Sequence, residues 1–145
     1  MPDTVWGFFY GGLISPDVMR RVGFAPRRQK QARLTGFDLR ISPLVNLVES
    51  PGDMVFGLLM ETTHAELAHV YGQLQATYLP QPVVAVDNRD GALVPALCYI
   101  VPDMAPGMAE ASHILPLLTA AESLGFPDWY LSKIRSFLPA ESPTA

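Results

Sequence analysis

The chain has 145 residues and a formal net charge of −4, with 49% hydrophobic and 17% charged residues. This length fits one domain with a full core, and no apolar run reaches the roughly 18 residues that a membrane-spanning helix requires. A lone cysteine, Cys98, excludes an internal disulfide framework. No His, Cys or carboxylate spacing supports a metal site, so we expect no metal and no cofactor. We also expect a cytoplasmic protein, with one domain over residues 1–138 and a frayed tail over 139–145.

The first predicted elements flank a double glycine. Residues 5–10 are apolar, β-branched and aromatic, and they stop at Gly11 and Gly12, which predicts a buried strand. Pro16 suits the first position of a helix, which we predict over 16–22. Glycines between a strand and a helix N-terminus expose backbone N–H groups that bind carboxylates or stabilise an oxyanion. A plain turn is the alternative.

The following segments predict strands in hairpin order and helices gathered late. Turn chemistry is expected at 50–53, and Thr63 to Glu66 match a capping box before a helix ending near Gly72. The expected strands are 31–41 with a bulge at Gly36, 55–60, 83–86 and 93–101, and the late helices are 113–123, with Pro116 in its first turn, and 127–137. This order predicts an α+β fold with a small, mostly antiparallel, barrel-like sheet flanked by helices.

Six of the ten cations lie in one short segment: Arg20, Arg21, Arg27, Arg28, Lys30 and Arg33. In an acidic chain, such a cluster favours a solvated basic face over a nucleic-acid site. We therefore expect a small-molecule ligand rather than nucleic acid or membrane, and a homodimer is left open.

Five short motifs follow one another along the chain. They are Phe9-Tyr10-Gly11-Gly12-Leu13-Ile14, Ala32-Arg33-Leu34, Ser50-Pro51-Gly52-Asp53-Met54-Val55-Phe56-Gly57, Leu97-Cys98-Tyr99-Ile100, and Leu124-Gly125-Phe126-Pro127 with Tyr130. In this order they resemble the γ-glutamylcyclotransferase family over nearly the whole length. The resemblance implies a small antiparallel β-barrel flanked by helices, with a pocket beside residues 10–13.

The resemblance also implies a chemistry. In that family the glycine loop holds a γ-glutamyl group, and a glutamate at the end of a Leu-Asp-x-x-Glu-Gly segment takes a proton from the substrate's α-amine. The amine attacks its own γ-carbonyl, 5-oxoproline forms and the amine portion leaves. Positioning drives such an intramolecular reaction, and a general base typically contributes about 10²–10⁴-fold.

This sequence differs from the family at the positions of the catalytic glutamate and of the glycine loop. Counting from Gly57 places Leu74 at the glutamate, and Tyr71 at the family's aspartate. Gly12 and Leu13 replace polar residues of the loop. Because no Asp or Glu lies between residues 66 and 87, we expect no 5-oxoproline release from ordinary γ-glutamyl compounds.

Two side chains are candidates for proton transfer. Counting back from Pro127 puts His113 where the family has a pocket Tyr, and histidine titrates near neutral pH. Tyr78 fits the family's Tyr before its next strand. The expected ligand-binding residues are Tyr10, Gly11, Gly12, Leu13, Tyr71, Leu74 and Tyr99. The alternatives are a surface or satisfied His113 and tyrosines that only pack in the core.

These residues leave three functions open. The first is a divergent cyclotransferase-like enzyme that cyclises, isomerises or eliminates a small, rather apolar metabolite beside residues 10–13. The second is a non-catalytic member that binds a small ligand or partner. The third is standard γ-glutamyl cyclotransfer, which needs a carboxylate from elsewhere, such as Glu49 or Glu61.

Overall fold

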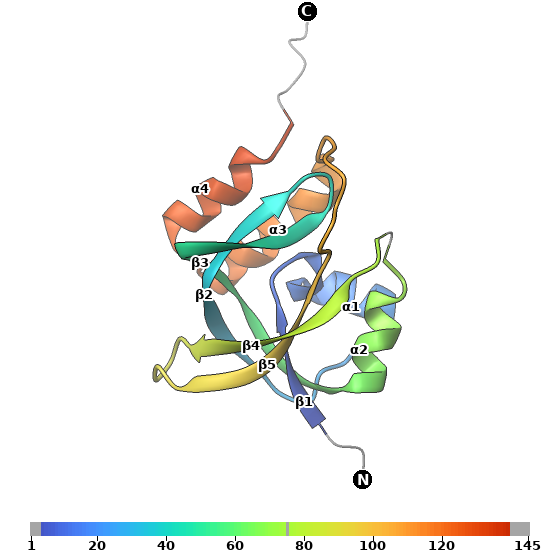
Figure 1. Cartoon of the computed structure of the whole chain (residues 1–145), viewed down its shortest axis with the longest axis vertical. Helices are drawn as coiled ribbons and strands as arrows, with labels where there is room; N and C mark the ends of the chain where they lie inside the picture. Colours follow the sequence, from blue (N-terminus) through green and yellow to red (C-terminus); the bar gives the residue numbers. More distant parts are fainter. Residues whose placement is uncertain (1–3, 75, 140–145) are drawn as a thin grey trace, which may run out of the picture.

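The computed structural model describes residues 4–74 and 76–139, so the tail expected over 139–145 lies almost wholly outside the described residues. Within them, two of the four α-helices follow the last strand, and the strands and helices form the α+β fold that the sequence predicts (Figure 1). The elements are β1 (Thr4–Phe9), the 3-10 helix η1 (Gly12–Ile14), α1 (Pro16–Val22), β2 (Gln29–Ile41), β3 (Val45–Thr63), α2 (His64–Tyr71), β4 (Leu79–Asp87), β5 (Leu93–Ile100), α3 (Ala111–Leu124) and α4 (Asp128–Ser136).

The five strands form a closed barrel in the order β1-β3-β2-β4-β5. All neighbouring strands are antiparallel except β1 and β5, which pair in parallel through Gly7 with Leu97 and Phe8 with Cys98. This single parallel pair closes the barrel. It also leaves the carboxyl end of β1 beside β5, at the position where the double glycine follows.

The prediction of a turn over 50–53 is wrong, because the chain does not reverse there. β3 continues through it, and the four residues form a bulge opposite Gly36 of β2, because Thr35 pairs with Met54 whereas Phe37 pairs with Glu49. Gly36 has φ +84°, which supports the predicted bulge in β2. The turn chemistry therefore bends one long strand instead of ending it.

Two other boundaries differ from prediction. α3 begins at Ala111, so Pro116 lies in the second turn rather than the first, and the carbonyl of Ser112 loses its helical N–H donor. β4 begins at Leu79 and includes two prolines. They are tolerated because β2 pairs with β4 only at Val86 and Asp87, which leaves that edge of β4 open earlier in the strand. The predicted capping box of α2 is confirmed.

Gly57 fixes how closely β1 approaches β3. A Cβ at this residue would lie well under 3.0 Å from the carbonyl oxygen of Phe9 and against the ring of Phe8. Backbone cannot yield as a flexible side chain can, so only glycine allows this contact. The close approach fixes the position of the end of β1, and hence of Tyr10, relative to β3.

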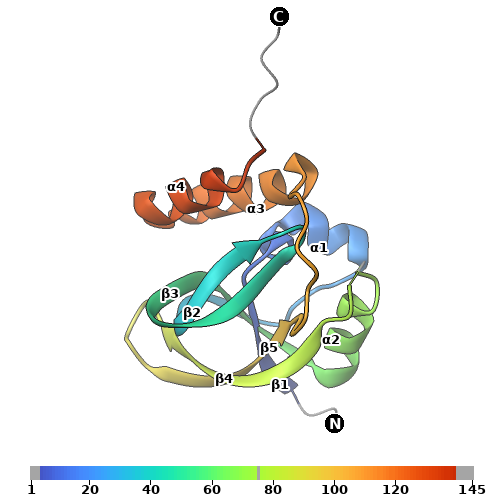
Figure 2. The same ribbon diagram turned by 45° about the horizontal axis from the view of Figure 1, so that its top comes forward.

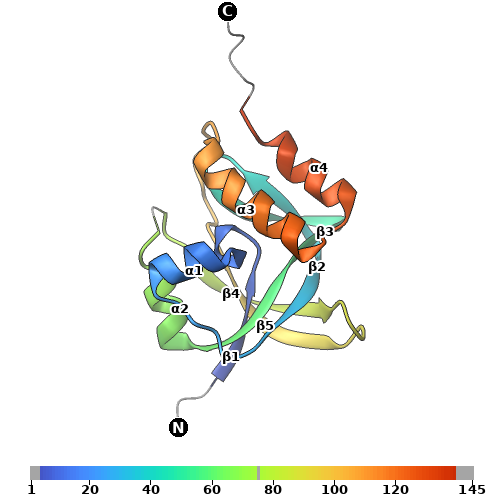
Figure 3. The same cartoon turned by 180° about the vertical axis from the view of Figure 1, so that it is seen from behind.

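The helices cover one end and one side of the barrel. α3 and α4 lie together across the end where η1 and α1 emerge, and α2 lies on the side near α1 (Figures 2 and 3). α3 packs against η1, so the loop after β1 is enclosed between the barrel and this helix. In the described part of the chain, none of the helices combines the length and the apolar character needed to cross a membrane.

Candidate binding and catalytic site

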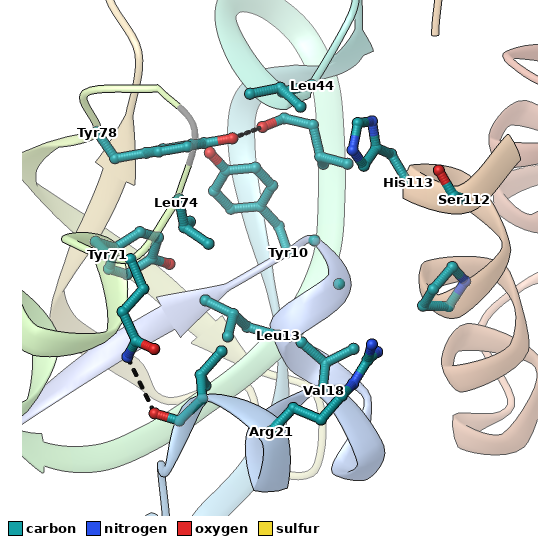
Figure 4. A pocket seen from close by; sticks show the side chains of 16 residues that line it. Tyr10, Leu13, Val18, Arg21, Leu44, Tyr71, Leu74, Tyr78, Ser112 and His113 are labelled. Atoms are coloured by element: carbon teal, nitrogen blue, oxygen red, sulfur yellow. Dashed lines mark hydrogen bonds between the residues drawn. The ribbon is translucent and has the colours of Figure 1, made fainter. Parts of the chain in front are cut away.

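A cavity of about 380 Å³ opens where the glycine loop, α1, α2 and α3 meet. Figure 4 shows Tyr10, Tyr78 and Leu74 converging on one side of this cavity, with His113 approaching from α3 on the other. The lining residues are Tyr10, Gly11, Gly12, Leu13, Val18, Arg21, Val22, Leu44, Val45, Tyr71, Gln73, Leu74, Tyr78, Ser112, His113 and Pro116. Most of this wall is aliphatic or aromatic, as in typical small-molecule pockets.

The glycine loop contributes backbone rather than side chains. The carbonyls of Gly11 and Gly12 accept hydrogen bonds from Ile14 (3.0 Å) and Ser15 (2.9 Å). In contrast, we find no hydrogen bond donated by the amides of Gly11, Gly12 or Leu13 to any acceptor in residues 4–74 and 76–139. A Cβ at Gly12 would meet nothing within 4 Å, so this residue faces open space. These three residues therefore line the cavity with backbone amides that have no acceptor among the described residues.

Three tyrosines build one wall and are already held in place. The hydroxyl of Tyr10 donates to the carbonyl of Tyr99 (2.6 Å), and that of Tyr78 donates to the carbonyl of Val45 (2.7 Å). The ring of Tyr71 stacks on Tyr99, with centroids 4.2 Å apart and planes 4° apart. The wall is rigid because each ring is fixed by a hydrogen bond or by stacking.

Burial keeps these phenols neutral. Desolvation raises the pKa of Tyr10 and of Tyr71 well above the ordinary value, and it raises the pKa of Tyr78 to about 12. A phenol with such a pKa can donate a hydrogen bond at neutral pH but cannot serve as a base. Of the expected acid and base roles of Tyr78, only the donation of a proton or hydrogen bond remains. Its hydroxyl already donates a hydrogen bond to the carbonyl of Val45.

His113 reaches the same cavity from the first turn of α3. Its side chain is half-buried, and its Nδ1 is buried without a hydrogen-bond partner in the part of the chain that the structure describes. Other titratable side chains on the wall are phenols and one guanidinium, which do not exchange protons near neutral pH. An imidazole can both accept and donate a proton, which makes His113 the proton-transfer candidate of this wall.

No carboxylate lies among the described lining residues. Glu61, one alternative source, pairs with Arg28 (2.7 Å) outside the cavity, and that hydrogen bond lowers its pKa. Glu49, the other, does not line it either. Glu66 caps α2 and pairs with Arg27 (2.6 Å). None of these three acids lines the cavity.

The structure brings together all but one of the residues expected at the site: Tyr10, Gly11, Gly12, Leu13, Tyr71, Leu74, Tyr78 and His113. Tyr99 instead lines an adjoining cavity of about 410 Å³, which shares Tyr71, Leu74 and Tyr78 with the first. Their roles in binding or catalysis stay predictions. Within the described ranges, no group of three His, Cys, Asp or Glu side chains is placed to hold a metal ion.

The end of α2 allows a second alignment with the Leu-Asp-x-x-Glu-Gly segment of the family that the sequence resembles. Leu67, Tyr71 and Gly72 match the Leu-Asp-x-x-Glu-Gly spacing without a gap, which places Tyr71 rather than Leu74 at the glutamate. Both residues line the cavity. In either register the position carries no negative charge at neutral pH, since burial raises the pKa of Tyr71.

The α1 face of the cavity was not predicted from the sequence. Val18, Arg21 and Val22 stand at helical positions i, i+3 and i+4, so they share one face of α1. That spacing was readable once the helix over 16–22 was predicted. Leu44 and Val45 were missed because only the fold brings the start of β3 beside Tyr78.

Comparisons with known proteins show the fold. A structure described as a γ-glutamyl cyclotransferase has 16% identity and a TM-score of 0.78, with 99% of this chain and 93% of that chain covered. An uncharacterised human protein is similar at 17% identity and a TM-score of 0.78, covering 98% and 92%. YkqA from Bacillus subtilis is similar at 18% and 0.75, covering 92% of this chain and 54% of YkqA. No family model matches the chain, and no curated protein matches it.

The buried phenols make stability depend on alkaline pH. An unfolded tyrosine loses its proton near pH 10.0, whereas Tyr10, Tyr71, Tyr78 and Tyr130 hold theirs to higher pH in the folded chain. Above pH 10 the unfolded chain therefore binds fewer protons, so the free energy of unfolding should be intact below this pH and fall above it. Urea titrations across this range should show the fall, and Tyr71→Phe should reduce its slope. An equal slope in the variant would contradict this account.

Proposed function

We propose that this chain binds a small, mostly apolar molecule carrying an oxygen acceptor in the cavity beside residues 10–13, and acts on it as a divergent cyclotransferase-like enzyme. The observation that carries the proposal is one shared cavity. It combines unpaired backbone donors at Gly11, Gly12 and Leu13 with the unpartnered Nδ1 of His113. The shared fold with a γ-glutamyl cyclotransferase structure supports it further.

The walls favour a ligand without an ammonium group. Leu13, Val18, Leu44 and Leu74 contribute aliphatic surface, and burying apolar ligand surface against them contributes about 25 cal/mol per Å². An amino-acid head would bring a positive charge to a wall with no carboxylate among the described residues. Burying a charge without a partner is costly, so zwitterionic substrates are disfavoured.

The proposed chemistry is a proton transfer. The loop amides hold the ligand's carbonyl oxygen and stabilise the negative charge that develops on it. The imidazole of His113 accepts a proton from the ligand and returns it, as a cyclisation, isomerisation or elimination requires. The phenol of Tyr78 positions the carbonyl of Val45 and thereby the start of β3 beside the ligand.

The second candidate is non-catalytic binding. It is favoured by the hydrogen bonds of two phenols on the wall, since Tyr10 and Tyr78 each donate to a backbone carbonyl and leave His113 as the one remaining candidate for proton transfer among the described lining residues. Standard γ-glutamyl cyclotransfer ranks third, because neither Glu49 nor Glu61 lines the cavity.

Ligand binding can be tested with 3-phenylpropanamide, a neutral probe with an apolar body and a carbonyl acceptor. Gly12→Leu should weaken its binding at least about tenfold, because the new side chain enters the open space at Gly12. Ala92→Leu, at an exposed turn, is the matched control and should bind like the parent chain. Titration calorimetry gives the dissociation constants. Absence of binding to the parent chain, or equal loss in both variants, would count against the cavity.

Catalysis can be separated from binding at His113. If the chain is an enzyme, His113→Gln should lower kcat on the identified substrate by about 10²-fold or more, with KM little changed and the thermal melt intact. Ser112→Ala, which changes the neighbouring lining residue, should keep most turnover. Undiminished turnover in His113→Gln would remove the proton-transfer role and leave binding as the function.

A further inference from the structure

Every cation of the basic segment except Arg21 has a side-chain partner within the described residues. Arg27 pairs with Glu66 (2.6 Å), Arg28 with Glu61 (2.7 Å) and Lys30 with Asp87 (3.2 Å). Arg20 pairs with Asp17, and Arg33 donates to Asn88 (3.0 Å). Arg21 has no such partner among residues 4–74 and 76–139. It is also the cation of this segment that lines the cavity.

The position of Arg21 follows from the short helix that carries it. Arg21 lies one turn after Val18 on α1, and both line the cavity, whereas Arg20 does not. In Figure 4 the Arg21 side chain extends along Val18 towards the gap before α3. An arginine stem can cover apolar surface in this way while its guanidinium stays at the mouth.

We propose that Arg21 binds the carboxylate of the ligand, so that the molecule taken by this cavity is a small carboxylic acid with an apolar body and no ammonium group. This inference rests on the proposed function and names its ligand class. Arg21 lies on α1 and His113 on α3, so the carboxylate and the reacting part of the ligand occupy different parts of the cavity.

Charge and geometry both support this assignment. A guanidinium is always charged and presents a planar fork that matches a carboxylate with two hydrogen bonds. The described lining residues include this cation and no acid that could neutralise it. A ligand carboxylate therefore supplies the counter-charge that Glu61, Glu66 and Asp87 supply to the neighbouring cations.

Three probes that share one body test the assignment: 3-phenylpropanoate, 3-phenylpropanamide and 3-phenylpropylamine. The parent chain should bind the carboxylate about tenfold more tightly than the amide, and the amine most weakly. Arg21→Gln should bind carboxylate and amide alike. Arg20→Gln, one residue away and outside the cavity, should keep the preference. Arg21→Lys should keep part of it, since a point charge replaces the fork.

The outcomes separate this inference from the function beneath it. Equal binding of carboxylate and amide by the parent chain, or an equal loss of preference in the Arg20 and Arg21 variants, would overturn the role of Arg21 while the cavity remains a binding site. Failure of all three probes to bind would overturn the proposed function and this inference together. Thermal melts and amide binding confirm that each variant is folded.

Discussion

The close contact of β1 with β3 at Gly57 is the constraint on which the site depends. The carbonyl of Phe9 occupies the space that any side chain at residue 57 would need. This contact therefore fixes where β1 ends relative to β3, and the chain continues out of the barrel as Tyr10 and the double glycine. The hydroxyl of Tyr10 then bonds to Tyr99 of β5, which secures the same end from the other side.

The chemistry of the cavity follows from what surrounds this fixed loop. Its tyrosines are buried and neutral, its carboxylates are absent among the described lining residues, and its one guanidinium is unpaired there. A pocket built in this way supplies hydrogen-bond donors and a positive charge, and no counter-charge for an ammonium group. The scaffold shared with a γ-glutamyl cyclotransferase structure thus surrounds a cavity whose described lining residues include one guanidinium and no carboxylate.

Local patterns predicted the parts of the fold that depend on local chemistry. The glycine-terminated strand, the proline-started helix and the capping box at Thr63 all form as expected. The prediction of a turn at 50–53 failed, because residues that favour turns also fit a bulge. Here the bulge lies opposite Gly36 and does not reverse the chain. The start of α3 was predicted too late, at residue 113, because Pro116 was expected in the first turn. The packing of α3 against η1 outweighs the one helical hydrogen bond that Pro116 removes.

The site was predictable only where the chain itself, or its resemblance to a family, marks it. The loop, Tyr71, Leu74 and His113 were expected and do line one cavity. The pairing of Tyr78 with Val45 joins segments 33 residues apart, which no local pattern could indicate. The sequence shows Arg21 only as one member of a basic cluster. The fold is needed to show that the neighbouring cations pair with an acid or an amide whereas Arg21 has no such partner among the described residues.

The central claim is that the loop amides hold the ligand's carbonyl oxygen, and nitrogen-15 amide spectra recorded during titration with 3-phenylpropanamide test it most directly. The account predicts that the Gly11, Gly12 and Leu13 amide signals move downfield, as hydrogen bonding to an acceptor requires. The amides of Gly91 and Gly125, which lie outside the cavity, should stay in place. Saturable shifts at Gly91 or Gly125, with the loop amides unmoved, would contradict the account.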